Sequence, residues 1–167
     1  MREEEYMRLA IGLAKKARGR TSPNPLVGAL VVKEGEIVGK GFHQKAGAPH
    51  AEINALNSAG EKSVGGELYI NLEPCNHYGR TPPCVKTIIN SGIKRVFVGI
   101  EDPNELVAGR GIQCLKDNGI HVQTGILREE CQRLNEVYLK YITEKKAICN
   151  SQISGQFRWQ DCYQDWR

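Results

Sequence analysis

Four residues of the chain have the types and spacing of a metal site with an acid–base group beside it. His50 and Glu52 stand two residues apart where a helix is expected to begin, Cys75 follows a proline, and Cys84 begins a further expected helix. At a helix start, unpaired backbone N–H groups and the helix dipole favour an anionic thiolate. One imidazole and two thiolates are good zinc ligands, and three protein ligands leave the fourth tetrahedral position for water. The pattern therefore predicts a catalytic zinc site.

Glu52 is the acid–base group of this expected site, because it lies beside the three ligands without being an obvious ligand itself. Zinc lowers the pKa of a bound water towards neutrality, and a nearby carboxylate can take its proton and pass it to a leaving group. His-x-Glu followed by Pro-Cys-x-x-Cys is the signature of zinc-dependent deaminases. Here eight residues, rather than two, separate Cys75 from Cys84. We therefore expect Glu52 to be the catalytic proton shuttle of a deaminase.

Two other interpretations of these residues stay open at this stage. The cysteines could fill the core and His50 could be satisfied by backbone at a helix start, since cysteine is among the most buried residue types. A closed structural zinc site is also conceivable, with His77 as a fourth ligand beside His50, Cys75 and Cys84. That second interpretation gives Glu52 no task.

The elements that must position these residues follow from hydrophobic periodicity and turn residues. Helices are expected over 3–16, 51–59, 83–89, 109–118 and 128–142, and strands over 26–33, 36–42, 67–71, 95–100 and 120–125. Glu34-Gly35 reads as the turn of a hairpin, after which strands alternate with helices. This order predicts an α/β fold, a three-layer α/β/α sandwich with a mixed central sheet.

The remaining cysteines and histidines give weaker signals. Cys114 and Cys131 fall inside expected helices and are interpreted as packing residues. His121 alternates with apolar neighbours on a strand, so we expect it to face solvent. His43, just after the hairpin, fits a loop residue and a site residue equally well.

Composition excludes several classes of protein. With 167 residues, 40% hydrophobic and 25% charged, the chain suits one globular domain. The longest apolar run, 26–32, is too short for a membrane span. A net charge of +4 is too mild to indicate a nucleic-acid binder. The acidic start lacks the apolar core of a signal peptide, so we expect a cytoplasmic protein, in which six cysteines favour metal binding or catalysis over disulfides.

At these residues the chain resembles the deaminase domain of the bacterial riboflavin-biosynthesis deaminase/reductase family, from about residue 4 to residue 143. The motifs that carry the resemblance are Thr21-Ser-Pro-Asn-Pro-Leu-Val-Gly28, His50-Ala-Glu-Ile-Asn-Ala-Leu56, Leu72-Glu-Pro-Cys-Asn-His-Tyr-Gly-Arg-Thr-Pro-Pro-Cys84, Asp102-Pro-Asn104 and Val107-Ala-Gly-Arg-Gly-Ile112. The insert between the two cysteines distinguishes this family from cytidine, guanine and transfer-RNA adenosine deaminases. The resemblance is therefore specific to a substrate as well as to a fold.

The resemblance implies a cytidine-deaminase-like fold and a hydrolase of riboflavin biosynthesis, acting at its second step. The family removes ammonia from 2,5-diamino-6-(5-phosphoribosylamino)pyrimidin-4(3H)-one and leaves 5-amino-6-(5-phosphoribosylamino)uracil. It implies one zinc ion per chain, a homo-oligomer, and neither a nucleic-acid nor a membrane partner. By match to the family, the zinc ligands are His50, Cys75 and Cys84, the proton donor is Glu52, and the substrate-binding residues are Asn24, His43, His77, Arg80, Asp102 and Asn104.

Two competing functions use the same residues differently. A nucleic-acid base deaminase of this fold would need a basic, aromatic groove, of which the charge balance gives no sign. A non-catalytic zinc module would be expected to lose the glutamate, yet the set of His50, Glu52, Cys75 and Cys84 is intact.

The chain divides at residue 146. We expect a deaminase domain over 1–146 and an aperiodic, disordered tail over 147–167, with Trp159 and Trp166 exposed. Codons chosen for this tail and read one base later spell a peptide with Ser-Leu-Asp-Gly-Lys-Ile-Ala, which resembles the start of the family's reductase domain. Our hypothesis is that the tail is a frame-shifted remnant of that domain, so no reductase activity is expected.

Overall fold

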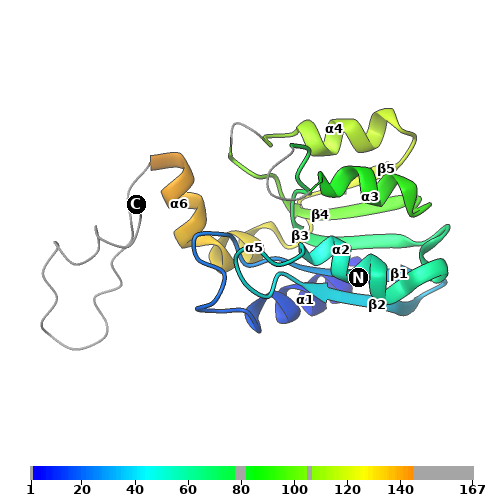
Figure 1. Ribbon diagram of the computed structural model, residues 1–167, viewed down its shortest axis with the longest axis horizontal. Helices are drawn as coiled ribbons and strands as arrows, with labels where there is room; N and C mark the ends of the chain where they lie inside the picture. The colour runs from blue at the N-terminus through cyan, green and yellow to red at the C-terminus, as the bar shows by residue number, and fades with distance from the viewer. Residues whose placement is uncertain (1, 78–81, 105–106, 145–167) are drawn as a thin grey trace, which may run out of the picture.

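One five-stranded sheet forms the centre of the described part of the chain. The structure, a computed structural model, describes residues 2–77, 82–104 and 107–144. The strand order is β2-β1-β3-β4-β5 (Figure 1). β1 runs antiparallel to both β2 and β3, whereas β3, β4 and β5 are parallel. The strands are β1 (Gly28–Lys33), β2 (Glu36–Phe42), β3 (Glu67–Leu72), β4 (Arg95–Ile100) and β5 (His121–Thr124).

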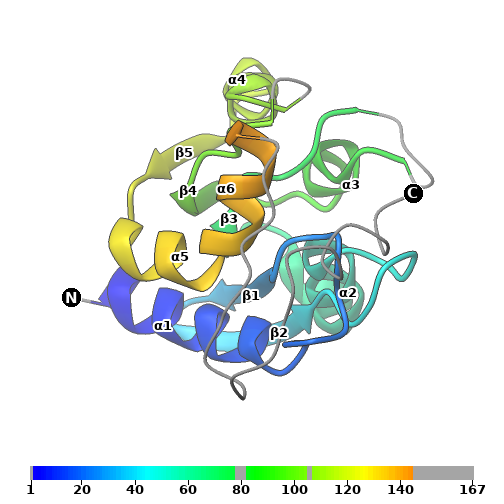
Figure 2. The ribbon, with the colours of Figure 1, turned by 90° about the vertical axis from the view of Figure 1, so that its left-hand side faces the viewer.

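Helices cover both faces of this sheet, as Figure 2 shows in a view along the layers. The helices are α1 (Arg2–Lys15), α2 (Ala51–Ala59), the 3-10 helix η1 (Gly60–Ser63), α3 (Cys84–Asn90), α4 (Arg110–Asp117), α5 (Arg128–Leu134) and α6 (Glu136–Glu144). Helices α2, α3 and α4 pack on one face, while α1 and α5 pack on the other. The predicted three-layer α/β/α sandwich with a mixed sheet is confirmed.

Alternation along the buried strands divides the core into two layers. In β3, Leu68 and Ile70 belong to the cluster under α2, α3 and α4, whereas Tyr69 belongs to the cluster under α1 and α5. In β4, Phe97 stacks on the Tyr69 ring with centroids 4.5 Å apart. Side chains of a strand point alternately to its two faces, so one strand supplies both cores. Because helices cover both faces of the sheet, successive residues of a central strand are all buried, and such a strand is a continuous run of apolar residues.

The sequence-based element bounds agree closely with the structure except near the C-terminal end of the described residues. The single helix expected over 128–142 is two helices, α5 and α6, with Asn135 between them. Asn135 is buried, and its side-chain amide makes a pair of hydrogen bonds with the backbone of Leu26, 2.8 Å at N–H and 2.9 Å at C=O. The partner of the Asn135 side chain lies in a loop that is distant in sequence. Local hydrophobic periodicity therefore did not predict that the helix is interrupted at Asn135.

One histidine and two cysteines that gave weaker signals in the sequence lie where they were expected. His121 is exposed, as expected for its face of β5. Cys131 is fully buried and Cys114 packs partly buried against the core, so both are packing residues as predicted. The predictions for Arg80 and for the tail over 147–167 lie outside the described residues. Across the described ranges, no helix is long and apolar enough to cross a membrane.

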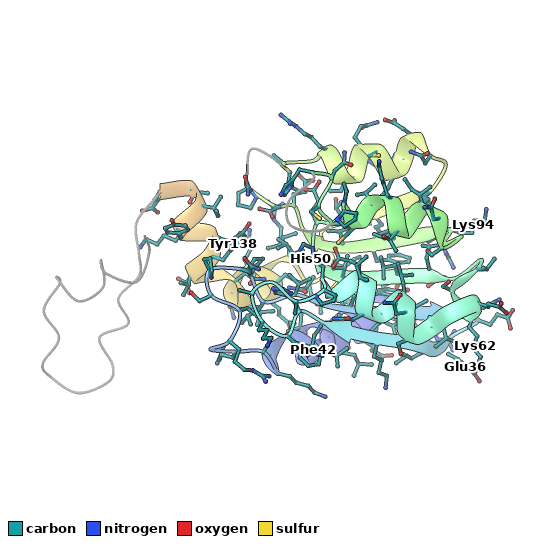
Figure 3. The ribbon with its side chains drawn as sticks, viewed as in Figure 1. Glu36, Phe42, His50, Lys62, Lys94 and Tyr138 are labelled. Atoms are coloured by element: carbon teal, nitrogen blue, oxygen red, sulfur yellow. The ribbon has the colours of Figure 1, made fainter. Side chains whose placement is uncertain are left out.

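The candidate site lies at one end of the sheet. Figure 3 shows His50 and Tyr138 at this end, with Lys62 and Lys94 at the opposite end. It is the end at which the parallel strands β3 and β4 finish, and open α/β sheets commonly bind their ligands beyond the carboxyl ends of such strands.

Candidate zinc and substrate site

His50 is placed by the start of α2 and by the close packing of that helix on β2. His50 is the N-cap residue of α2, and its carbonyl accepts the N–H of Asn54 at 3.1 Å. Gly41 of β2 faces α2, and a Cβ atom there would overlap the Ala51 carbonyl oxygen and the Ala55 backbone nitrogen. A glycine at this point lets the helix lie directly on the strand, which sets the depth at which His50 and Glu52 enter the site.

Cys75 and Cys84 come together because the loop after β3 returns to the start of α3. Cys75 lies three residues beyond the end of β3, and Cys84 is the first residue of α3. The Cys84 N–H donates to the Cys75 Sγ at 3.4 Å, and the next N–H, of Val85, donates to the Cys75 carbonyl at 3.3 Å. The N–H at the start of α3 therefore stabilises a thiolate at Cys75, whereas the sequence predicted the favoured thiolate at Cys84 itself.

The ligand atoms of His50, Cys75 and Cys84 converge on one point. The His50 Nδ1 lies 3.2 Å from the Cys84 Sγ and 3.6 Å from the Cys75 Sγ, and all three atoms fall within 4.8 Å of one another. Two ligand atoms on a tetrahedral zinc, at bond lengths of about 2.0–2.3 Å, lie roughly 3.5 Å apart. The donor set and its spacing fit one zinc ion. His77, although described, is outside this group, so the closed four-ligand alternative lacks its fourth ligand.

Without a metal ion, His50, Cys75 and Cys84 share protons among themselves. The pKa of Cys75 is lowered, mainly because the Cys84 thiol donates a hydrogen bond to it and also because of the His50 ring. The pKa of Cys84 is raised by the same hydrogen bond, so the pair holds one proton between them. The pKa of His50 is raised chiefly by its hydrogen bond with Cys75. A cation at this point would displace these protons, as metal binding to Cys and His does.

Glu52 is buried behind the ligands, in the first turn of α2. Burial raises the pKa of its carboxyl group from 4.5 to about 7, with the positive charge of His50 acting in the opposite direction. A group whose pKa is near neutrality can both accept and release a proton at physiological pH. This is the property that a proton shuttle needs.

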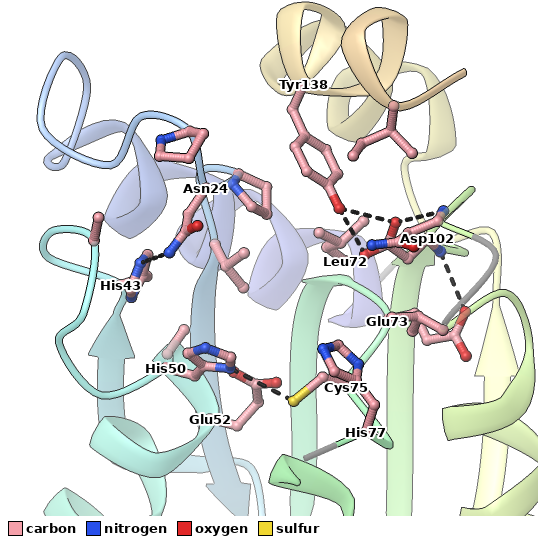
Figure 4. Close-up of a pocket in the computed structure, with 18 of the residues that line it drawn as sticks. Asn24, His43, His50, Glu52, Leu72, Glu73, Cys75, His77, Asp102 and Tyr138 are labelled. Carbon is pink, nitrogen blue, oxygen red and sulfur yellow. Dashed lines mark hydrogen bonds between the residues drawn. The ribbon is translucent and has the colours of Figure 1, made fainter. Parts of the chain in front are cut away.

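A cavity of about 660 Å³ opens in front of the ligands and of Glu52 (Figure 4). That volume lies within the range of small-molecule sites. The sequence-predicted site residues that line it are Asn24, His43, His50, Glu52, Cys75, His77, Asp102 and Asn104. Cys84 is 1% exposed and lies behind the wall. Every predicted site residue that the structure describes is thus at or directly behind this one cavity.

Asn24 and His43 act as a connected pair in the wall. The His43 Nδ1 lies 3.2 Å from the Pro49 carbonyl oxygen, to which it can only donate, so Nε2 accepts from the Asn24 amide at 3.0 Å. Burial lowers the pKa of His43, which favours the neutral ring that this pattern requires. The amide of Asn24 is therefore oriented with its NH2 on His43 and its Oδ1 available as an acceptor. His43 therefore lies in the cavity wall, and its role as a substrate-binding residue stays a prediction.

Asp102 is fixed by the loop that follows β4. Asp102 is 7% exposed, and its Oδ1 accepts the N–H of Asn104 at 2.9 Å. Its own N–H donates to the carboxylate of Glu73 at 3.2 Å. Burial raises the pKa of Asp102, while the bonds from Asn104 and Tyr138 lower it. Asp102 therefore presents a restrained carboxyl group to the cavity.

Glu73 organises this region and was missed as a functional residue by sequence reasoning. Its carboxylate is buried and accepts four backbone N–H groups at 3.0–3.3 Å, those of Asp102, Gly109, Gly111 and Ile112. Burial raises the pKa of Glu73, against the effect of these donors. It thereby ties the start of the Cys75 loop to the loop after β4 and to the start of α4. The available signal was an acidic residue directly after an apolar strand.

His77 and Tyr138 complete the wall on the side of β4. The Nδ1 of His77 is buried without a hydrogen-bond partner among the described residues, as expected of a polar atom that awaits a ligand. Tyr138, from α6, places its hydroxyl 3.1 Å from each oxygen of Asp102. No spacing or motif distinguished Tyr138, because its contact joins residues 36 positions apart in sequence.

Comparisons with known proteins agree with this geometry. Residues 1–100 match the family described as the cytidine and deoxycytidylate deaminase zinc-binding region. The chain is 56% identical over 144 residues to riboflavin biosynthesis protein RibD of Aquifex aeolicus, covering 86% of this chain and 40% of that protein. It is 50% identical over 140 residues to the diaminohydroxyphosphoribosylamino-pyrimidine deaminase of Buchnera aphidicola, covering 84% of this chain and 95% of that protein.

Solved structures show the same likeness. A diaminohydroxyphosphoribosylaminopyrimidine deaminase/5-amino-6-(5-phosphoribosylamino)uracil reductase of Thermotoga maritima superposes with a TM-score of 0.83 at 47% identity, covering 87% of this chain and 42% of that chain. The Rib2 deaminase of Aspergillus oryzae in complex with DARIPP superposes with a TM-score of 0.67 at 27% identity, covering 86% of this chain and 95% of that chain.

Proposed function

Since the chain belongs to the cytidine and deoxycytidylate deaminase zinc-binding family, we propose that it deaminates 2,5-diamino-6-(5-phosphoribosylamino)pyrimidin-4(3H)-one. The observation that carries the proposal is the convergence of His50, Cys75 and Cys84 within 4.8 Å, beside buried Glu52 at a cavity of about 660 Å³. The likeness to the Buchnera deaminase over 95% of its length supports the choice of substrate. The complex of the Aspergillus deaminase with DARIPP supports a pyrimidine ligand in this pocket.

His50, Cys75 and Cys84 would hold the zinc ion. When bound there, zinc supplies Lewis acidity that makes water a nucleophile near neutral pH. Glu52 takes a proton from the attacking water and delivers it to the exocyclic amine, for which a pKa raised to about 7 suits it. The new C–O bond replaces the C–N bond, ammonia leaves, and the product is the corresponding uracil. In this proposal, Glu52 moves the proton, and His50, Cys75 and Cys84 hold the zinc ion.

Substrate recognition is assigned to the polar residues of the cavity wall. Asn24 offers an oriented acceptor through its bond with His43, and His77 offers a ring nitrogen, Nδ1, that has no hydrogen-bond partner within the described part of the chain. Asp102 and Asn104 offer a further acceptor and an amide to the pyrimidine or the ribose. Arg80, outside the described residues, is proposed for the phosphate because a guanidinium binds phosphate oxygens well.

Only the deaminase step is proposed for this chain, which spans 40% of the length of the Aquifex RibD protein. The division into a domain over 1–146 and a tail over 147–167 is likewise a proposal, and sequencing the gene around the tail tests the frame-shift hypothesis. Cytoplasmic location and homo-oligomeric assembly are proposed from the family resemblance. Light scattering of the purified protein tests the assembly.

The change Glu52→Gln tests the proton-shuttle role. Glutamine keeps the shape of the side chain but cannot take up a proton at neutral pH, so we expect the variant to keep zinc and fold and to lose at least about 100-fold in kcat for ammonia release. Cys84→Ser is the contrasting variant, since it removes a ligand and should lower zinc content measured by atomic absorption. Wild-type turnover by Glu52→Gln would remove Glu52 from the mechanism.

A further inference from the structure

The carboxylate of Asp102 is held from two directions, one of which is a helix at the C-terminal end of the described residues. Its Oδ1 accepts the N–H of Asn104, and the Tyr138 hydroxyl lies 3.1 Å from Oδ1 and 3.1 Å from Oδ2 (Figure 4). Asn104 lies two residues beyond Asp102 in the same loop, whereas Tyr138 lies in α6 (Glu136–Glu144). The second restraint on Asp102 therefore comes from the C-terminal end of the described residues.

Helix α6 contacts the edge of the core through Tyr138 and Leu139 and lines the cavity with one of its sides. None of its residues is fully buried, and Val137 is 56% exposed. Tyr138, Tyr141 and Ile142, at spacings of three and four residues, share one side of the helix and line the cavity. Helix α6 thus supplies three residues of the cavity wall, and one of them, Tyr138, also packs against the core.

We propose that Tyr138 is a positioning residue of the deaminase pocket, which fixes the carboxylate of Asp102 in the orientation that binds substrate. The proposal rests on the proposed function, because the donor that Asp102 would accept is an N–H or O–H group of the diaminopyrimidine ribotide. A carboxylate has about four acceptor positions. Asn104 donates to Oδ1 and the Tyr138 hydroxyl lies between Oδ1 and Oδ2, so two donors use part of this acceptor capacity and the proposal assigns the rest to the substrate.

The hydroxyl of Tyr138 is suited to this role because it stays a hydrogen-bond donor. Burial raises the pKa of Tyr138, so the phenol stays protonated and donates at all ordinary pH values. Without that donor, the buried carboxylate keeps the hydrogen bond from the Asn104 N–H, while the Asp102 backbone stays held by the hydrogen bond from its own N–H to the Glu73 carboxylate. A lost hydrogen bond to a charged group corresponds to about a tenfold change in an equilibrium constant.

The test is a double-mutant cycle on the full chain loaded with zinc. Tyr138→Phe removes the hydroxyl and keeps the ring, Asp102→Asn removes the acceptor charge, and the double variant closes the cycle. Tyr6→Phe is the matched control, because it also removes a phenol that donates one hydrogen bond, at 2.7 Å to the Gly35 carbonyl, away from the cavity. Zinc content and melting temperature establish that each variant is folded.

We expect Tyr138→Phe to raise the KM for the diaminopyrimidine ribotide about tenfold and to change kcat by less than about twofold, since zinc ligands and Glu52 are untouched. In the Asp102→Asn background the same change should cost less than about twofold, because the group it positions is gone. Tyr6→Phe should leave KM unchanged. An unchanged KM in Tyr138→Phe, or an equal loss in both backgrounds, would overturn the positioning role.

A crystal structure of Tyr138→Phe separates this proposal from the proposed function. The positioning role predicts that the Asp102 carboxylate rotates away from its wild-type orientation, whether or not the protein turns over this substrate. A carboxylate that stays in place refutes the role of Tyr138 even in an active enzyme. A wild-type protein that releases no ammonia refutes the proposed function, while the crystal structure still decides the role of Tyr138.

Discussion

At the scale of single residues, the site depends on acidic groups that the fold keeps away from water. Glu52, Glu73 and Asp102 are all buried, and burial raises the pKa of each. Their surroundings assign them different tasks. Glu73 is surrounded by backbone donors and holds loops together, whereas Glu52 lies beside the proposed zinc ligands, where a pKa of about 7 lets it exchange a proton.

The raised pKa of Glu52 predicts how the stability of the metal-free protein depends on pH. The folded state holds the proton up to about pH 7, but the unfolded chain releases it near 4.5, so folding is weakened as pH rises between these values. The variant Glu52→Gln has no carboxyl group to titrate at this position, so its unfolding free energy does not fall for this reason as pH rises. Relative to the metal-free wild type, the variant should gain up to about 3 kcal/mol of unfolding free energy between about pH 4.5 and about pH 8.

Urea unfolding of the chelator-treated proteins across this pH range measures that difference. Because other ionisable groups are common to both proteins, subtraction isolates Glu52. A difference that stays constant with pH would show that the carboxyl group of Glu52 titrates normally in the folded protein.

At the scale of elements, the site is built where helix starts meet the ends of strands. Helix α2 brings His50 and Glu52, the loop after β3 brings Cys75, and α3 begins with Cys84. Their relative positions depend on how closely the helices approach the sheet. The tightest such approach for the site is that of α2 on Gly41 of β2.

Gly41→Ala tests the dependence of the site on this approach. The added methyl group would overlap backbone atoms of Ala51 and Ala55, so α2 must move outward and carry His50 with it. We expect a loss of about 1–3 kcal/mol of unfolding free energy together with weaker zinc binding. Gly12→Ala is the control, because an added Cβ at Gly12 of α1 meets nothing within 4 Å and should stabilise the helix by about 0.5–1 kcal/mol.

Chemical denaturation and competition with a zinc-binding dye measure both effects. If Gly41→Ala bound zinc as tightly as the wild type, the depth of α2 on the sheet would not control the site.

Some of the helices and strands could be predicted from the sequence, and others could not. Helix α2 and strand β4 have the bounds expected from periodicity, because local pattern and core packing agree there. The break between α5 and α6 was missed because Asn135 bonds to Leu26, which is distant in sequence. The zinc ligands were predictable from residue type and spacing. Glu73 and Tyr138 were not, since their partners are set by tertiary structure.

At the scale of the whole molecule, the sheet separates two hydrophobic cores, and the candidate site lies at one end of the sheet. The apolar residues of β3 and β4 serve both faces, so the strands are fixed by packing on either side. Their carboxyl ends therefore provide a rigid base for the loops that carry Cys75 and Asp102. Helix α6 then adds the outer wall, with Tyr138 facing Asp102. A pocket with rigid walls and few, oriented polar groups is suited to one class of small substrate.

The most direct test of the account is ammonia release by the purified chain with its zinc content known. We predict about one zinc ion per chain. We also predict ammonia release from 2,5-diamino-6-(5-phosphoribosylamino)pyrimidin-4(3H)-one that disappears on chelation and returns with zinc, and turnover of cytidine and deoxycytidylate slower by at least about 100-fold. Ammonia release from cytidine or deoxycytidylate at the greater rate, or no release from the diaminopyrimidine ribotide by the zinc-loaded protein, would contradict the account.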